Sequence, residues 1–359
     1  VLTMIDELLR QRHLPDLLRF IDGEKVTREN WDKRREEIIR LLSQEYGDLP
    51  PAPVSVNFLQ KSEESFCAGK ANLVETILIC NLKEGGEFSF PVKSVIPVKD
   101  EKQPSFILIN FHDDVPDRYL PSEELCDLGF AVHSFCYKDI TSDDENYNGK
   151  LASFYCGKKE NLERGKIALW AWAAIRVLDF VLTLPETDPE EIALIGHSRL
   201  GKTALLAGGL DTRFTTVISN NSGCSGAALS RDKEGETIKK IFNRFPYWFK
   251  SGYGEYADKE HELPFDQHFL LALCAPRKLY IASAALDSWA DPLSEFLSAS
   301  AATAVYELLG EKGLDSDNLP PEENVLLHEG IIGYHKRSGT HYLSRFDWNA
   351  FARFIKTGC

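Results

Sequence analysis

Short apolar runs of strand length alternate with longer segments of helical periodicity along most of the 359-residue chain. Residues 106–111 are almost entirely apolar, as expected for a strand buried on both faces of a parallel sheet. Residues 129–135, 215–220 and 279–286 predict further strands, and residues 162–183 predict a long buried helix. Because strands and helices alternate, the pattern predicts an α/β fold with a mostly parallel central sheet.

The N-terminal part of the chain has a different pattern. Residues 5–48 place apolar side chains at helical spacing, and consecutive prolines end that region. Residues 54–98 are strand-like around a glycine turn, which predicts an antiparallel start of the sheet. We therefore expect a single domain over residues 1–359, in which residues 1–50 form a helical extension packed on the rest.

One junction between strand and helix carries a candidate nucleophile. The apolar residues 192–195 lead into Gly196, His197 and Ser198, and good helix formers follow. This order is typical of the nucleophile elbow of α/β-hydrolases, in which a sharp turn exposes a serine at the end of the sheet. A second glycine, Gly201, comes three positions after the serine instead of two. The alternative is a serine that caps an ordinary helix.

Two further residues complete the order of an α/β-hydrolase triad, which runs serine, acid, histidine. Asp287 follows the strand predicted at 279–286, and His341 lies in a turn after the strand-like residues 333–335. In this interpretation His341 takes the proton of Ser198, and Asp287 holds the histidine in the required tautomer. The sequence therefore predicts a three-layer α/β-hydrolase sandwich.

Other residues could fill the same roles. His335 is an alternative base, although its place inside a strand is typical of a core histidine. Asp291 is an alternative acid, although Pro292 after it favours a helix start. Asp139, in the polar segment after residues 129–135, could contact substrate or simply lie in an exposed acidic loop.

Positive and aromatic side chains are expected around the serine. Arg199 and Lys202 follow Ser198 by one and four positions, so they either face an oxygen-rich substrate or are solvated helix residues. The aromatic segment 231–261 is long enough to shape a pocket.

Composition limits the possible partners and compartments. The net charge of −14 argues against general binding to nucleic acid or anionic membranes, and no apolar run approaches the ~20 residues of a membrane span. The eight cysteines lack paired metal-ligand spacing and indicate free thiols. These features and a start without signal-peptide character favour the cytoplasm; a signal removed before residue 1 would make the protein secreted.

Several motifs together resemble the glucuronoyl esterases, carbohydrate esterase family 15, and especially its bacterial branch. The resemblance covers most of the chain from about residue 100 onward. Its motifs are residues 196–202, 220–226, 263–268, 287–292 and 339–341.

The resemblance implies a serine esterase with an α/β-hydrolase fold and without metal or cofactor. It implies that Ser198 is the nucleophile, His341 the base and Arg199 an oxyanion donor. Lys202, Glu236 and Trp289 correspond to residues that hold the sugar, and Gln267 is a weaker candidate for that task.

This chain departs from the family pattern in two places. Many members carry the triad acid where this chain has Asn221 and Ser222, so Asp287 is expected to be the acid, as in the members most like it. Two cysteines of fungal members, which form a bridge, are replaced by His197 and Tyr342.

The expected substrate is an ester of (4-O-methyl-)glucuronic acid, on xylan or xylo-oligosaccharides, with lignin-type or simple alcohols. One alternative is an acetyl or general carbohydrate carboxylesterase. Another is a catalytically silent hydrolase-fold binding protein, which the missing acid near Asn221 would permit.

Overall fold

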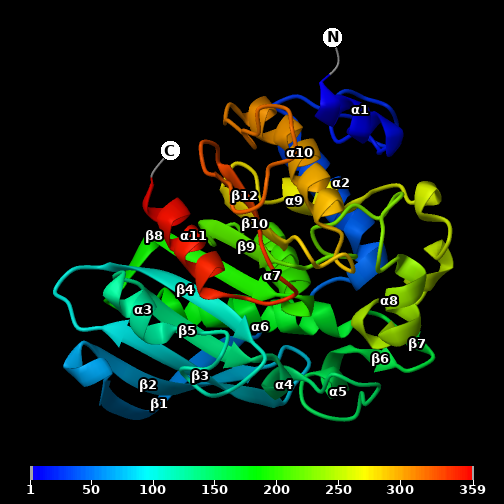
Figure 1. Ribbon diagram of the computed structural model, residues 1–359. Helices are drawn as coiled ribbons and strands as arrows, with labels where there is room; N and C mark the ends of the chain where they lie inside the picture. The colour runs from blue at the N-terminus through cyan, green and yellow to red at the C-terminus, as the bar shows by residue number, and fades with distance from the viewer. Residues whose placement is uncertain (1–2, 358–359) are drawn as a thin grey trace.

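The strands that carry the site belong to one ten-stranded mixed sheet (Figure 1). The computed structural model describes residues 3–357. The order across the sheet is β1-β2-β3-β5-β4-β8-β9-β10-β12-β11. The bounds in that order are Ser55–Phe66, Ala71–Asn81, Glu87–Pro97, Ala131–Cys136, Gln103–Asn110, Thr187–His197, Thr216–Asn220, Lys278–Ala284, Ile332–Arg337 and Leu326–Leu327.

The direction of the strands confirms the predicted mixed sheet. Strands β5, β4, β8, β9, β10 and β12 pair in parallel, whereas β1, β2, β3 and β5 pair antiparallel. The short β11 adds an antiparallel pair at the other edge. The carboxyl ends of the parallel strands therefore meet along one edge, where open α/β sheets place their ligands.

Helices cover both faces of the sheet, which gives the three layers predicted from the sequence. On one face lie α11 (Arg345–Lys356) and α3 (Ser122–Asp127), whose apolar side chains pack on β4, β5, β8 and β10. On the other face lie the long apolar helices α6 (Lys166–Val181) and α7 (Arg199–Leu210). Five further helices follow the N-terminal extension: α4 (Tyr137–Ile140), α5 (Ala152–Tyr155), α8 (Ile238–Arg244), α9 (Gln267–Ala272) and α10 (Pro292–Leu309).

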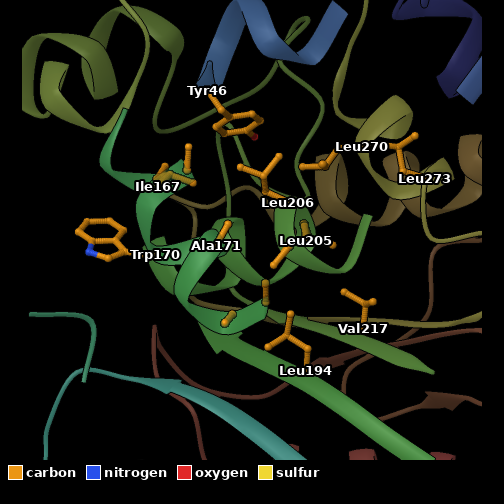
Figure 2. Close-up of a cluster of buried hydrophobic side chains, with 14 of the residues drawn as sticks. Tyr46, Ile167, Trp170, Ala171, Leu194, Leu205, Leu206, Val217, Leu270 and Leu273 are labelled. Atoms are coloured by element: carbon orange, nitrogen blue, oxygen red, sulfur yellow. The ribbon is translucent and has the colours of Figure 1, made fainter. Parts of the chain in front are cut away.

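The N-terminal extension contains two helices, α1 (Met4–Gln11) and α2 (Trp31–Tyr46). Figure 2 shows how the end of α2 joins the main core, because the Tyr46 ring lies above apolar side chains of α6, α7 and α9. The labelled members of this cluster are Tyr46, Ile167, Trp170, Ala171, Leu194, Leu205, Leu206, Val217, Leu270 and Leu273. The extension thus packs on the layer that carries the nucleophile elbow.

Shorter elements connect this framework. The pair β6 (Gly157–Lys158) and β7 (Asn161–Leu162) forms a separate small hairpin. Four 3₁₀ segments occupy Cys67–Gly69, Pro246–Trp248, Tyr253–Tyr256 and Glu260–Glu262. Within residues 3–357, no helix combines the length and the apolar character needed to cross a bilayer.

Candidate active site

Ser198 occupies the sharp turn between β8 and α7. Its backbone has φ 57° and ψ −126°, a strained conformation for a residue other than glycine. A Cβ atom on Gly196 would lie 1.9 Å from the carbonyl oxygen of Leu200, so the turn requires a glycine there. This strand, strained serine and helix have the geometry of a nucleophile elbow, and the side chain lines a cavity at the carboxyl end of the sheet.

Asp287 and His341 meet although 54 positions separate them. The ring Nδ1 of His341 lies 2.6 Å from Oδ2 of Asp287. Asp287 follows β10 and is 5% exposed, whereas the side chain of His341, in the loop before α11, is 42% exposed. Burial alone would raise the pKa of Asp287, but hydrogen bonds from His341, Asn221 and the Ala290 N–H hold it below its usual value. An ionised carboxylate therefore fixes the histidine.

A single cavity of about 310 Å³ brings most of the predicted residues together. Its lining contains the three residues of the candidate triad and four of the five others predicted from the sequence. The lining residues are Ser198, Arg199, Lys202, Asn221, Ser222, Gly223, Glu236, Arg244, Phe245, Trp248, Asp287, Trp289, Ala290 and His341. Gln267 is the predicted residue that is absent from this lining.

The expectation that Gln267 contacts the sugar disagrees with its position in α9. Gln267 is fully buried, and its amide nitrogen donates a 3.0 Å hydrogen bond to Oε2 of Glu45. Its amide oxygen accepts a 3.4 Å hydrogen bond from the hydroxyl of Tyr46. The side chain is thus directed to the end of α2, away from the cavity lining.

Lys202 is not a solvated helix residue. Its side chain is buried, and Nζ donates to the carbonyl oxygens of Ser222 and Cys224 in the loop after β9. The Glu236 carboxylate lies 3.8 Å from the same nitrogen. The N–H of Glu236 donates a 2.9 Å hydrogen bond to the carbonyl oxygen of Trp289, a residue that is 46% exposed. Lys202, Glu236 and Trp289 thus form one connected wall of the cavity.

Arg199 lies on another wall and is anchored by residues that sequence reasoning did not select. Its guanidinium pairs with Asp143 and lies 4.7 Å above the ring of Trp248. Phe245 stacks on Trp248 with centroids 3.9 Å apart and an interplanar angle of 6°. The aromatic segment 231–261 therefore contributes to the cavity lining, as expected from its length.

His197 is a further residue near the site, to which the sequence analysis assigned no role. Its buried ring lies 4.6 Å from the ring of His341, and its Nδ1 is 2.6 Å from Oδ1 of Asn220. Burial lowers the pKa of His197 to about 3, so this ring stays neutral beside His341. His197 ends β8, and His341 lies in the loop before α11. The signal in the sequence was the family resemblance, because the fungal bridge joins the positions of His197 and Tyr342, the neighbour of His341.

The alternative residues lie elsewhere. His335 is buried between the Tyr280 hydroxyl, at 2.9 Å, and the Asp347 carboxylate, at 2.8 Å, as expected for a core histidine. Asp291 caps the N-terminus of α10 by accepting from the Ser294 N–H. Asp139 lies 3.8 Å from Nζ of Lys150 and outside the cavity lining.

Residues 3–357 contain no group of three or more histidine, cysteine or acidic side chains placed to hold a metal ion. The seven cysteines in this range are free thiols.

Comparison with known proteins agrees with this geometry. The family model described as "Glucuronyl esterase, fungi" matches residues 80–310. The chain is 35% identical to carbohydrate esterase MZ0003, from an unknown prokaryotic organism, over an alignment that covers 95% of this chain and 88% of the relative.

Two solved structures share the fold along nearly the whole chain. A glucuronoyl esterase from Solibacter usitatus superposes with a TM-score of 0.88 at 31% identity, covering 96% of this chain and 97% of that one. A promiscuous CE15 esterase from a marine bacterial metagenome gives a TM-score of 0.85 at 36% identity, with coverage of 95% and 96%. The chain therefore belongs to carbohydrate esterase family 15, the glucuronoyl esterases, and is a carboxylic ester hydrolase.

Proposed function

We propose that the chain hydrolyses esters of (4-O-methyl-)glucuronic acid, on xylan or xylo-oligosaccharides, by a Ser-His-Asp mechanism. The observation that carries this proposal is the 2.6 Å hydrogen bond between Asp287 and His341 in the cavity that Ser198 lines. An ionised acid, an imidazole and a hydroxyl on a strained turn are the groups that acyl transfer needs.

In the first half of the reaction, Oγ of Ser198 forms a bond to the ester carbonyl carbon while His341 takes the serine proton. The carbonyl oxygen becomes negative and receives hydrogen bonds from Arg199. The carbon–oxygen bond to the alcohol then breaks, and His341 returns the proton to the leaving oxygen. In the second half, water repeats these steps and releases the uronic acid and the free serine.

The wall made by Lys202, Glu236 and Trp289 supports recognition of a sugar. The exposed ring of Trp289 offers a face for the C–H groups of a pyranose, and the Glu236 carboxylate can accept from sugar hydroxyls. Lys202 connects Glu236 to the loop after β9. A cavity of about 310 Å³ fits one sugar and a small alcohol, so a longer oligosaccharide would extend beyond it.

Hydrolysis of benzyl or methyl glucuronate tests the function. We expect release of the alcohol by the native chain, no release by Ser198→Ala, and native rates for the control Ser300→Ala, which changes a serine of α10 outside the cavity. Equal activity on simple acetyl esters with none on uronate esters would favour the general carboxylesterase. Failure of a fluorophosphonate to label Ser198 would favour a catalytically silent binding protein.

We also propose a reducing compartment, the cytoplasm, as the place of action. The support is that the seven cysteines among residues 3–357 are free thiols and six of them are buried. Recovery of the native protein from an extracellular or periplasmic fraction of its host would contradict this proposal.

We further propose that the chain folds as one domain that includes residues 1–50. The support is the packing of Tyr46 in the main core and the hydrogen bond from its hydroxyl to the carbonyl oxygen of Ser225 at 2.9 Å. A single unfolding transition seen alike by fluorescence and circular dichroism is expected. Two separate transitions would contradict it.

A further inference from the structure

Asp143 lies in the loop between α4 and α5 and is bonded on both carboxylate oxygens. Its Oδ2 accepts from Nη1 of Arg199 and, at 3.0 Å, from the hydroxyl of Tyr137. Its Oδ1 accepts a 2.8 Å hydrogen bond from Nε1 of Trp248. The carboxylate, with 9% of its side chain exposed, therefore ties Arg199 to the aromatic ring beneath it.

The loop that carries Asp143 is itself held by a buried ammonium. Lys166, the first residue of α6, is fully buried, and burial lowers its pKa. Its Nζ donates to the carbonyl oxygens of Ser142, Asp144 and Asn146, at 2.7, 2.7 and 2.9 Å. Three backbone acceptors on one cation fix the path of the loop on either side of Asp143.

Arg199 depends on these contacts for its position. Among residues 3–357, Asp143 is the carboxylate with which Arg199 forms an ion pair, and Nε of Arg199 has no hydrogen-bond partner there. An arginine side chain has several rotatable bonds, so an unanchored guanidinium would occupy many positions in the cavity. The ion pair uses Nη1 and leaves other N–H groups of the guanidinium for a ligand.

We propose that Asp143 is a positioning residue that holds the Arg199 guanidinium where the oxyanion develops beside Ser198. The inference rests on the proposed function, because it requires Arg199 to donate to that oxyanion. Oxyanion donors accelerate acyl transfer when they are already in place as the charge develops. Asp143 partly offsets the positive charge of Arg199. The guanidinium nevertheless stays protonated and keeps its N–H donors, so the fixed position of these donors matters more to the oxyanion than the partial loss of charge.

The test is a double-mutant cycle between Asp143 and Arg199, with kcat and KM measured on benzyl glucuronate. Asp143→Asn removes the charge and keeps the shape and an acceptor for Trp248, so the variant is expected to fold. Asp139→Asn is the matched control, because it makes the same charge change in the same region without touching Arg199. Thermal unfolding of each variant reports on folding.

We expect Asp143→Asn to lower kcat about tenfold with KM within about twofold, and Arg199→Ala to lower kcat about a hundredfold or more. In the Arg199→Ala background, Asp143→Asn should change kcat by less than about twofold, because the group it positions is gone. If Asp143 acted only by keeping the loop folded, Asp143→Asn would lower kcat by the same factor in the native and the Arg199→Ala backgrounds.

Four results would overturn the proposal: an unchanged kcat in Asp143→Asn, an unchanged kcat in Arg199→Ala, an equal fall in both backgrounds, or an Asp143→Asn variant that fails to fold. An unchanged kcat in Arg199→Ala would also remove the oxyanion-donor role given to Arg199 in the proposed function. The ester hydrolysis itself fails separately, if the native chain does not hydrolyse the ester or if Ser198→Ala still does.

Discussion

The side-chain amide of Asn221 donates a 3.0 Å hydrogen bond to Oδ2 of Asp287, the same oxygen that His341 contacts at 2.6 Å. Asn221 follows β9 and Asp287 follows the neighbouring strand β10. At the position where many relatives were expected to carry the triad acid, this chain thus has an amide that supports the acid from the next strand. The carboxylate is held from two sides.

Removal of this amide should slow the chemical step. Asn221 has φ 47°, so Asn221→Gly deletes the side chain without adding backbone strain. The loss of one hydrogen bond to a charged group, worth about 1 to 2 kcal/mol, predicts a fall in kcat of about fivefold to thirtyfold with little change in KM. Steady-state kinetics on benzyl glucuronate measures this, with Asn318→Gly as control, because Asn318 is exposed and has a similar φ of 61°. An unchanged kcat would contradict it.

Trp289 should bind the sugar and not the reacting ester. We expect Trp289→Ala to raise KM for a glucuronate ester about threefold to tenfold, because a stacking face worth about 1 kcal/mol is lost. Hydrolysis of a small acetate ester should stay within about twofold of native, and Trp289→Phe should recover most of the affinity. Equal losses on both esters would show that the ring serves the catalytic geometry instead.

Gln267 should matter for stability and not for substrate. Gln267→Ala removes the hydrogen bonds to Glu45 and Tyr46 and leaves the Glu45 carboxylate without that donor. We expect a loss of about 1 to 3 kcal/mol in the free energy of unfolding, measured in urea, with KM unchanged. A rise in KM without loss of stability would restore Gln267 as a sugar contact.

Glu295 should make the chain less stable as the pH rises. Burial raises the pKa of this carboxyl to about 7, although it accepts hydrogen bonds from the Gly223 N–H and the Ser283 hydroxyl. The folded state therefore binds this proton more tightly than the unfolded state. Its stabilising contribution is complete below the unfolded pKa of about 4.5 and is lost as the pH rises through about 7.

Glu295→Gln removes that titration. Between pH 5 and pH 8, the native chain should lose on the order of 3 kcal/mol of unfolding free energy relative to this variant. Urea unfolding at the two pH values measures the difference, and the exposed variant Glu322→Gln should behave like the native chain. The prediction is contradicted if the unfolding free energies of Glu295→Gln and the native chain change by the same amount between the two pH values.

The turn at Ser198 could be predicted because its determinants are adjacent in the chain. An apolar strand, a glycine and a helix-forming segment lie within fifteen positions, and the structure has β8, Ser198 and α7 there. Asp287 and His341 could be selected because each follows a strand in the order that the fold requires. Their hydrogen bond, however, depends on how β10 and β12 pair, which no local pattern gives.

Asp143 and Gln267 show where the sequence was insufficient. The segment after β5 indicated an acidic loop near the site but did not single out Asp143, because the partner of Asp143 lies 56 positions away and its ammonium anchor 23 positions away. Gln267 belongs to a family motif, but a motif does not tell whether a side chain faces a cavity or another helix. The partners of Asp143 and the orientation of Gln267 are both set by tertiary packing.

The proposed mechanism requires that His341 activates Ser198. We would measure the rate at which a fluorophosphonate labels the protein, and locate the adduct by mass spectrometry of the peptide that contains Ser198. This mechanism predicts one adduct, on Ser198, formed more than about a hundredfold more slowly in His341→Ala. Labelling of another residue, or equal rates in the native chain and His341→Ala, would contradict it.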